Sequence, residues 1–440
     1  MRNAAMVLLA AIACALACAA PDVRVIIEED IYTYESPNNG SGPLWSFGCT
    51  AIARIGERVF VSQMETGKDI PPLCNTRWRL LERTENGWTL RAEADGFRQR
   101  EPAVLATDAR KTLYLNVNDS IMPPGTQYGA CEPHILAFDV DRGPFSPRKL
   151  SPQWTGTPTF TDHSYRGYAA DPAASQLLMF NIDAETSVQH WCLLSMEGEP
   201  LKHGGVAFPI RSCYPQVSLK NGRAGILAIG DIVEPNEEWR AYKFEQTQRK
   251  WDYVFRVLYF SSTPDIAAQD FGPPIEIANV DATGGHITNQ DLWIAPDGAA
   301  HIMYTEREVA SPLMRDKFFP GKSTTNSLML AVVRQGVVAE RRLLIPGSED
   351  EQPGHARFHL MPDGTVYALV YISGKQPRNV LMRIHPDLDV TDPVPVPLQT
   401  PLSSYLLATE RAGNAPSTTI DALGAGRSDN SIAYVQIRLN

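Results

Sequence analysis

Histidine, tyrosine and arginine gather at the beginning of several short apolar runs. The segment 161–168 reads TDHSYRGY and places His163, Tyr165 and Arg166 almost side by side. A neutral imidazole beside a phenol can take up a proton and return it, and a guanidinium holds a carboxylate or a sulfate by paired, charge-assisted hydrogen bonds. These residue types therefore predict acid–base chemistry on an anionic substrate.

Other repeats supply the same residue types at their openings or in nearby loops. We expect catalysis by His134, His163, Tyr165 and Tyr214. We expect substrate binding by Arg77, Arg100, Arg166, Arg211, Arg240, His286, Gln290, Arg357, Trp191 and Trp239. The two tryptophans of this set lie near predicted loops and are expected to stack on sugar rings, whereas Trp251 is expected in the core.

Together these groups suit β-elimination on a uronate-containing polysaccharide, sulfated or not. An arginine would neutralise the carboxylate at C5 and so acidify the neighbouring C–H bond, while histidine and tyrosine would take that proton and protonate the departing glycosidic oxygen. The scheme needs no metal and no cofactor, so we predict neither. His355 and His359 could ligate a metal, but no third ligand lies near them in the sequence.

The elements that must position these residues are short strands. Runs rich in branched and aromatic residues recur as hairpins, most clearly LWIA and HIMY around Asp297-Gly298, and FHLM and VYAL around Asp363-Gly364. The hairpin turns fall near positions 56, 108, 171, 221, 297, 363 and 413. Each interval has room for two more strands, so the sequence predicts an all-β, seven-bladed β-propeller.

The two ends of the chain are expected to share one blade. The last repeat offers only three strands, and the apolar run 23–28 near the beginning can supply the fourth, outer strand. Pairing it there would cover an exposed sheet edge and close the ring. We therefore expect residues 20–440 to form a single propeller domain.

The first 19 residues are predicted to be a signal peptide. Arg2 precedes an apolar run, and small residues follow it, with cleavage expected after Ala19 or Ala20. Lipid attachment at Cys18 is the alternative, although the lipobox match is loose. Either reading places the mature protein outside the cytoplasm, secreted or periplasmic, or lipid-anchored on the outer surface, and no later run is long enough for a transmembrane segment.

The net charge of the chain limits which classes of partner it can bind. The formal net charge is −10, and the sequence has no basic stripe, which argues against nucleic acid as a partner. An acidic polysaccharide or oligosaccharide bound by local arginines remains the expected partner.

Five cysteines follow the leader, namely Cys49, Cys74, Cys131, Cys192 and Cys213. Their odd number leaves one thiol over, and Cys74 with Cys131, both in predicted loops, is the first pair expected to form a disulfide.

The segment 289–304, NQDLWIAPDGAAHIMY, resembles those of sialidase-like, BNR-type propellers of environmental bacteria. Within that group, the length and the stock of His, Tyr and Arg are similar to those of ulvan-lyase-type polysaccharide lyases, which use two histidines, a tyrosine and an arginine in the channel mouth. By order along the chain, the resemblance implies His134 or His163 as the histidines, Tyr214 as the tyrosine, and Arg211 or Arg240 as the arginine.

Two other functions remain open from the sequence. A sialidase-like glycoside hydrolase would use Arg100, Arg211 and Arg357 as an arginine triad with Tyr405 and Glu410, but the Ser-x-Asp-x-Gly-x-Thr-Trp box of that family is absent. A general hydrolase would need two carboxylates flanking the bond. A propeller that binds glycan or protein without catalysis is the third class, because fold alone does not fix function.

Overall fold

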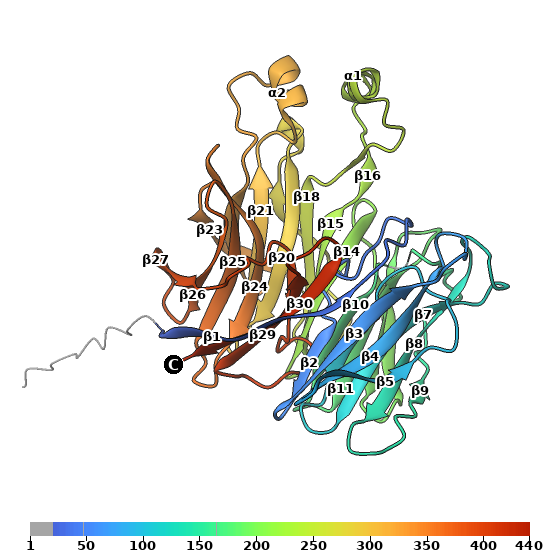
Figure 1. The fold of residues 1–440 in the computed structure, drawn as a ribbon. Coiled ribbons are helices and arrows are strands. Elements are labelled where there is room, and N and C mark those ends of the chain that lie inside the picture. Colours follow the sequence, from blue (N-terminus) through green and yellow to red (C-terminus); the bar gives the residue numbers. More distant parts are fainter. Residues whose placement is uncertain (1–20, 47, 164) are drawn as a thin grey trace, which may run out of the picture.

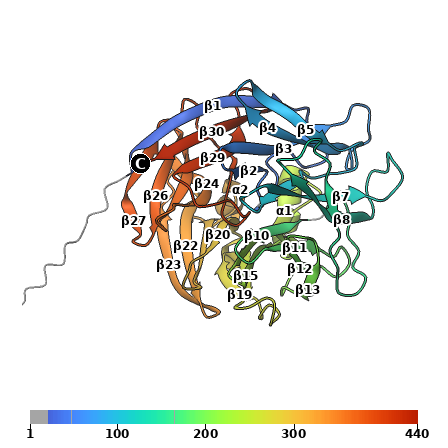
Figure 2. The same ribbon diagram turned by 90° about the horizontal axis from the view of Figure 1, so that it is seen from below.

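The computed structural model describes residues 21–46, 48–163 and 165–440. The predicted signal peptide, residues 1–19, lies outside the described residues. The described residues form seven four-stranded antiparallel sheets arranged in a ring (Figures 1 and 2). The predicted seven-bladed β-propeller is therefore confirmed.

The blades follow one another along the chain, each built from its inner to its outer strand. Blades 1 and 2 comprise β2 (Ile52–Ile55), β3 (Arg58–Thr66), β4 (Thr76–Thr84) and β5 (Gly87–Glu93), then β6 (Val104–Thr107), β7 (Thr112–Ser120), β8 (Cys131–Asp139) and β9 (Arg148–Leu150). Blades 3 and 4 comprise β10 (Gly167–Asp171), β11 (Gln176–Ile182), β12 (Gln189–Ser195) and β13 (Pro200–Val206), then β14 (Ser212–Lys220), β15 (Arg223–Gly230), β18 (Val257–Thr263) and β19 (Ile275–Asn279). Blades 5 and 6 comprise β20 (His286–Ile294), β21 (Ala300–Arg307), β22 (Ser327–Arg334) and β23 (Val337–Ile345), then β24 (Glu351–Leu360), β25 (Val366–Gly374), β26 (Arg378–His385) and β27 (Asp389–Val396).

Blade 7 is closed by the N-terminal strand, as the sequence predicts. It comprises β28 (Tyr405–Leu407), β29 (Thr419–Ala425), β30 (Ser431–Leu439) and β1 (Val23–Thr33). β1 pairs with β30 from Val23↔Leu439 to Thr33↔Ser431, so the two ends of the described chain lie in one sheet. This pairing gives β30 a partner on both sides and removes an open edge.

The residues at the turns explain why the hairpins can be predicted from the sequence. Asn221 and Gly222 take φ values of 50° and 78°, the left-handed backbone that a tight two-residue hairpin requires. At the turn of blade 2, the Asp108 carboxylate accepts hydrogen bonds from the N–H groups of three following residues at 2.8–2.9 Å. Such residues fix a turn locally, before any blade packs on another.

The loop between β28 and β29 joins the inner strands of other blades. The Arg411 guanidinium is buried and donates to the Gly48 carbonyl (2.5 Å), the Val217 carbonyl (3.1 Å) and the Asp291 carboxylate (2.7 Å). Gly413 is obligatory here, since its φ is +81° and a Cβ atom would meet the Thr107 carbonyl oxygen at 2.0 Å. One loop thereby links blade 7 to blades 1, 4 and 5.

Two insertions project from one end of the ring (Figure 1). The first lies between β15 and β18 and contains β16 (Ile232–Val233), α1 (Glu237–Thr247) and β17 (Tyr253–Val254); a short 3₁₀ turn, η1 (Asp281–Thr283), follows β19. The second, between β21 and β22, contains α2 (Pro312–Phe318). The sequence predicts a loop near Trp239, where the structure has α1. Asn236 caps this helix by accepting from the Trp239 N–H, and two acidic residues lie in its first turn, which is a recognisable helix start.

Two further expectations need correction. The described cysteines are all buried free thiols, so the Cys74–Cys131 disulfide is not formed. Trp251 was expected in the core but is 80% exposed, because it sits on the first insertion and not on a blade strand. No helix among the described residues is long and apolar enough to cross a membrane.

We expect Arg411→Ala to lower the free energy of unfolding by about 3–5 kcal/mol, because it leaves the Asp291 carboxylate buried without its cation. Denaturant titration measures the change. The matched control is Arg334→Ala, which removes an exposed pair with Asp297 and should cost about 0–1 kcal/mol. Equal losses in the two variants would contradict the central role of Arg411.

Candidate active site

Three of the four predicted catalytic residues, His163, Tyr165 and Tyr214, meet at the end of the ring where the inner strands begin. His163 and Tyr165 precede β10, Glu101 precedes β6, and Tyr214 lies near the start of β14. In a meander of antiparallel strands, these openings share one end with the loops between second and third strands. The same end therefore carries the α1 and α2 insertions (Figure 1).

Three side chains form a hydrogen-bonded chain. His163 Nδ1 lies 2.9 Å from Glu101 Oε1, and the Tyr165 hydroxyl is hydrogen-bonded to His163 Nε2. Because a carboxylate only accepts, Nδ1 carries the imidazole proton in this arrangement and Nε2 accepts from Tyr165. The carboxylate thus fixes the tautomer and the orientation of the ring.

Aromatic packing holds this chain in place. The Trp45 and His163 rings are stacked, with centroids 5.4 Å apart and an interplanar angle of 3°. Tyr214 packs edge-on against Trp45 at 5.9 Å and against Tyr165 at 4.7 Å. The four rings leave His163 little rotational freedom, which suits a group that must move protons.

The backbone under the two tyrosines is strained. Tyr165 has φ +40° and Tyr214 has φ +54°, in the left-handed region that bulky residues rarely occupy. A register shift in the pairing of β14 with β15 surrounds Tyr214, and the Tyr214 carbonyl accepts from Asn289 Nδ2 at 2.8 Å. Strain of this kind persists only where neighbouring contacts hold it, and it clusters at functional sites.

Arg211 places a cation beside the tyrosine. Its Nη1 donates to the Asp231 carboxylate at 2.6 Å and to the Asp231 carbonyl at 2.9 Å, and its Cζ lies 5.4 Å from the Tyr165 ring and 5.9 Å from the Tyr253 ring. The side chain is 32% exposed. Within the described part of the chain its hydrogen bonds come from Nη1, so Nε and Nη2 are left for a ligand.

Both tyrosines are neutral phenols at rest. Burial raises the pKa of Tyr165 and of Tyr214 well above the ordinary value, and the neighbouring tyrosine hydroxyl adds to the shift at Tyr165. A raised pKa makes each phenol a weaker acid, and its phenolate, once formed, a stronger base. Deprotonation of Tyr165 therefore needs a neighbouring base, and His163 is hydrogen-bonded to its hydroxyl.

Two further predicted arginines lie close to this cluster but are engaged elsewhere. Arg100 Nη1 donates to the Asp162 carboxylate at 3.1 Å. Arg166 is buried and donates to the Asn116 carbonyl at 2.9 Å and to the Pro102 carbonyl at 2.7 Å. Arg166 therefore supports the loop that carries Glu101 and does not face the substrate, which corrects its predicted binding role.

His134 and Arg77 are held in other blades. His134 is buried in β8, its Nδ1 hydrogen-bonded to the Glu132 carbonyl at 3.0 Å and its Nε2 lying 3.7 Å from the Asp119 carboxylate. Burial lowers its pKa. Arg77 in β4 is paired with Glu65 and Glu93. Neither residue contacts the His163–Tyr165 chain, so the structure does not bring them to the cluster.

Gln290, Arg357 and Trp191 have structural partners. Arg357 is buried and donates to the Gln290 carbonyl at 2.5 Å and to the Ala356 carbonyl at 2.9 Å. Gln290 is also buried, and its side chain accepts from the Ala356 N–H at 3.1 Å. Trp191 has no exposed surface and packs in the core of blade 3. These three predictions of substrate contact are wrong, because inward-facing strand positions pack against the next blade.

Trp239 and Arg240 lie on α1. Trp239 packs against Phe318 and Phe319 and covers the Arg256 guanidinium, 5.1 Å from its ring. It therefore joins the two insertions and does not form a sugar platform. Arg240 is exposed and lines a groove beside the helix.

Three residues of the cluster, Glu101, Trp45 and Asp231, are not among the site residues predicted from the sequence. The one available signal was position, since Glu101 stands at a repeat opening directly after Arg100. Nothing in the chain order says that segments 62 residues apart meet at a hydrogen bond.

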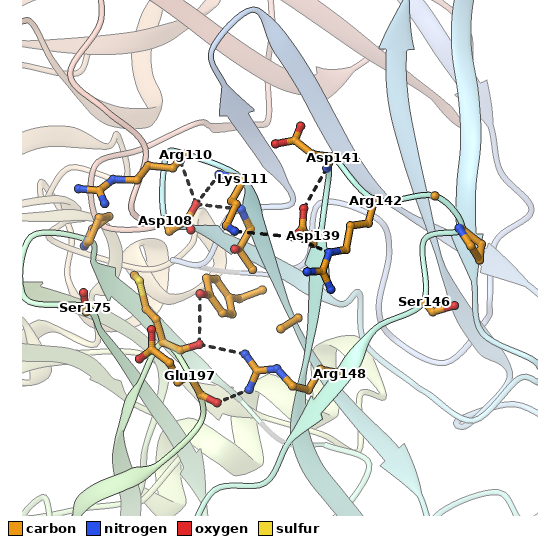
Figure 3. A pocket seen from close by; sticks show the side chains of 17 residues that line it. Asp108, Arg110, Lys111, Asp139, Asp141, Arg142, Ser146, Arg148, Ser175 and Glu197 are labelled. Atoms are coloured by element: carbon orange, nitrogen blue, oxygen red, sulfur yellow. Dashed lines mark hydrogen bonds and ion pairs between the residues drawn. The ribbon is translucent and has the colours of Figure 1, made fainter.

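One cavity adjoins the site and another lies away from it. A small one of about 20 Å³ lies behind Tyr165 and Tyr214, bounded by Trp45 and Glu101, and offers room for one water molecule. A larger one of about 940 Å³ lies at the opposite end of blades 2 and 3 (Figure 3). Among its charged groups, Asp139 is paired with Arg142 and Lys111, whereas Asp108 and Arg148 are hydrogen-bonded to backbone groups.

Among the described residues, no group of three or more His, Cys, Asp and Glu side chains is placed to hold a metal ion.

No protein-family model and no curated protein matches the sequence. The fold is similar to that of a solved ulvan lyase, described as a new family of polysaccharide lyase. Its complex with -[GlcA(1-4)Rha3S]- matches with a TM-score of 0.58 and 10% identity, covering 93% of this chain and 96% of that chain. A second structure of that lyase matches with a TM-score of 0.57 at the same identity and coverage. The predicted resemblance is thus confirmed at the level of the fold.

His286 is predicted to stay neutral at neutral pH. Burial, with the Arg307 and Arg256 cations nearby, lowers its pKa to about 4. We expect its imidazole NMR signals to show no titration between about pH 5.5 and pH 8. A midpoint near the ordinary value of about 6.5 would contradict this environment.

The same shift makes stability depend on pH. The unfolded chain binds the His286 proton more tightly than the folded chain, so the free energy of unfolding falls as pH falls from about 6.5 towards 4, by at most about 1.4 kcal/mol per pH unit from this group. His286→Gln should flatten that slope. An unchanged slope would assign the effect to other histidines.

Proposed function

We propose that this protein is an exported polysaccharide lyase that cleaves uronate-containing polysaccharides by β-elimination. The observation that carries the proposal is the hydrogen-bonded chain from Glu101 through His163 to Tyr165, with the Arg211 guanidinium over the Tyr165 ring. It unites a proton relay and a carboxylate-binding cation in one place. The proposal includes removal of residues 1–19 during export.

Substrate binding begins at Arg211. The uronate carboxylate binds its Nε and Nη2 edge, while Asp231 holds the Nη1 side and keeps the guanidinium oriented. Neutralising the carboxylate stabilises the enolate-like charge that develops when the C5 proton leaves. The interaction strengthens in the transition state, which is where binding accelerates a reaction.

Tyr165 then acts as base and acid. Its phenolic proton moves to His163 Nε2, and the resulting imidazolium is stabilised by Glu101. The phenolate takes the C5 proton, the C5–H electron pair forms the C4–C5 double bond, and the C4–O bond breaks. The re-formed phenol protonates the departing oxygen, and His163 returns its proton to Tyr165, so the enzyme ends as it began.

The two hydrolase alternatives are less well supported by the geometry. Glu101 is bound to His163 and Asp231 to Arg211, so the nearest carboxylates are engaged and do not form a facing acid–nucleophile pair. In the sialidase scheme, Glu410 is paired with Lys220, a residue at the far end of β14 from Tyr214. A propeller that only binds glycan would not need the strained tyrosines.

The fold likeness selects the first substrate to try. The similar solved lyase carries -[GlcA(1-4)Rha3S]-, which contains a uronate beside a sulfated sugar. Ulvan is therefore the leading candidate, with alginate and polygalacturonate as uronate polymers of other linkage. Sulfate would bind arginine by the same paired hydrogen bonds as carboxylate.

We expect the purified protein to release products that absorb in the ultraviolet, as the C4–C5 double bond requires, from at least one of these polymers. Tyr165→Phe should lower kcat by about 10²–10⁴, the usual contribution of a positioned acid–base group. Tyr128→Phe, at a loop position 67% exposed, is the matched control and should keep full activity. New reducing ends without ultraviolet absorbance would overturn the lyase mechanism in favour of hydrolysis.

Arg211→Lys separates binding from proton transfer. Lysine keeps a positive charge for Asp231 but loses the planar fork, so we expect KM for the active polymer to rise about tenfold or more while the fold is retained. Steady-state kinetics and a thermal melt measure the two effects. An unchanged KM would exclude Arg211 as the carboxylate-binding group.

A further inference from the structure

We propose that Trp251 and Tyr253 form a stacking platform for the sugar unit next to the one bound at Arg211. This inference rests on the proposed function, because it extends the same bound polysaccharide onto the blade 4 insertion. The platform would recognise the apolar C–H face of a pyranose ring in an acidic polysaccharide. The sequence analysis assigned neither residue to substrate binding.

Arg211 connects the platform to the reaction centre. The guanidinium contacts two rings, with its Cζ 5.4 Å from the Tyr165 centroid and 5.9 Å from the Tyr253 centroid. A carboxylate bound at the open edge of Arg211 would therefore lie near both the catalytic phenol and the Tyr253 ring. A polysaccharide chain that extends from Arg211 towards Tyr253 would pass over that ring.

The alternation of side chains turns Trp251 to the same side as Tyr253. Asp252, between them, points at α1, where its carboxylate accepts from Lys243 Nζ at 2.8 Å. Because successive side chains in an extended segment point to opposite sides, residues 251 and 253 face away from Lys243. The contact of Tyr253 with Arg211 agrees with this direction.

Trp251 is the most exposed large apolar side chain among the described residues, and Tyr253 is also exposed. Trp251 is 80% exposed and Tyr253 is 43% exposed, whereas the core tryptophans Trp78 and Trp293 are 6% and 4% exposed. Leaving an indole in water forgoes a large burial gain, and an exposed aromatic pair beside a polar site is typical of a binding surface.

Buried contacts hold the backbone at the base of the insertion. Glu234 is fully buried and binds both Lys243 of α1, at 2.7 Å, and the Arg256 guanidinium, with Nη1 at 3.0 Å. The Glu234 N–H also donates to the Asp252 carbonyl at 2.8 Å, next to Trp251. These contacts reduce the backbone conformational entropy that the insertion loses when a sugar binds, which favours affinity.

Charge favours a polyanion as the occupant. The cation beside the platform is Arg211, whose Cζ lies 5.9 Å from the Tyr253 ring, whereas Arg240, Arg249 and Lys250 line the groove of α1 together with Glu237 and Asp252. An acidic polysaccharide supplies both the apolar ring faces and the carboxylates that the platform and Arg211 bind. An acidic glycan is therefore the expected ligand of the platform.

The test measures binding apart from catalysis. Ulvan oligosaccharides are titrated by calorimetry into the Tyr165→Phe variant, and into the same variant carrying Trp251→Ala or Tyr253→Ala. We expect each added substitution to weaken binding about three- to tenfold, the effect of losing one aromatic stacking contact. Phe244→Ala, on the exposed side of α1 in the same insertion, is the matched control and should bind as tightly as the parent.

In the otherwise wild-type enzyme, Trp251→Ala should raise KM by the same factor and leave kcat nearly unchanged. Unchanged affinity and KM in both platform variants would overturn the platform while leaving the lyase proposal intact. Oligosaccharide binding that depends on Trp251, in a protein that produces no unsaturated ends, would support the platform and overturn the lyase proposal. Equal weakening by Phe244→Ala would also overturn the platform, since it would show a general loss of the insertion.

Discussion

The architecture depends on a buried ion pair between Arg411 and Asp291. The Arg411 side chain extends from the β28–β29 loop and is hydrogen-bonded to blades 1, 4 and 5. Asp291 also accepts from the Phe358 N–H of blade 6 at 2.8 Å. Two buried charges are tolerated because they pair with each other and form further hydrogen bonds with main-chain groups. The pair fixes how inner strands from distant parts of the chain are spaced, and therefore where their openings lie.

The candidate site uses that spacing. Glu101, His163 and Tyr214 come from blades 2, 3 and 4, and their side chains meet only because those inner strands are held at neighbouring angles around one axis. The left-handed backbone at Tyr165 and Tyr214 costs free energy, which the packing of the surrounding rings offsets. The insertion of blade 4 then places Tyr253 against Arg211, so that the same cation serves the reaction centre and the proposed platform.

Electrostatics in this protein is decided locally. The formal net charge is −10, yet the exposed edge of Arg211 is cationic because Asp231 engages only one of its nitrogens. Arg166 and Arg357, which look equivalent in the sequence, donate instead to carbonyl oxygens, those of Asn116 and Pro102 in the preceding blade for Arg166 and those of Gln290 and Ala356 for Arg357. The number of arginines therefore says little about the binding surface, whereas the partner of each guanidinium says a great deal.

The sequence by itself determined the seven blades, their hairpin turns and the closure by Val23–Thr33, because turn residues such as Asn221-Gly222 and period-two apolar runs act over a few residues. It also identified His163, Tyr165, Tyr214 and Arg211 as candidate reactive groups. Only the tertiary structure decided that Glu101 orients His163, that Trp191 is buried and that Trp251 is exposed. Those facts depend on contacts between blades, which join segments far apart in the sequence. Local sequence patterns carry no information about such contacts.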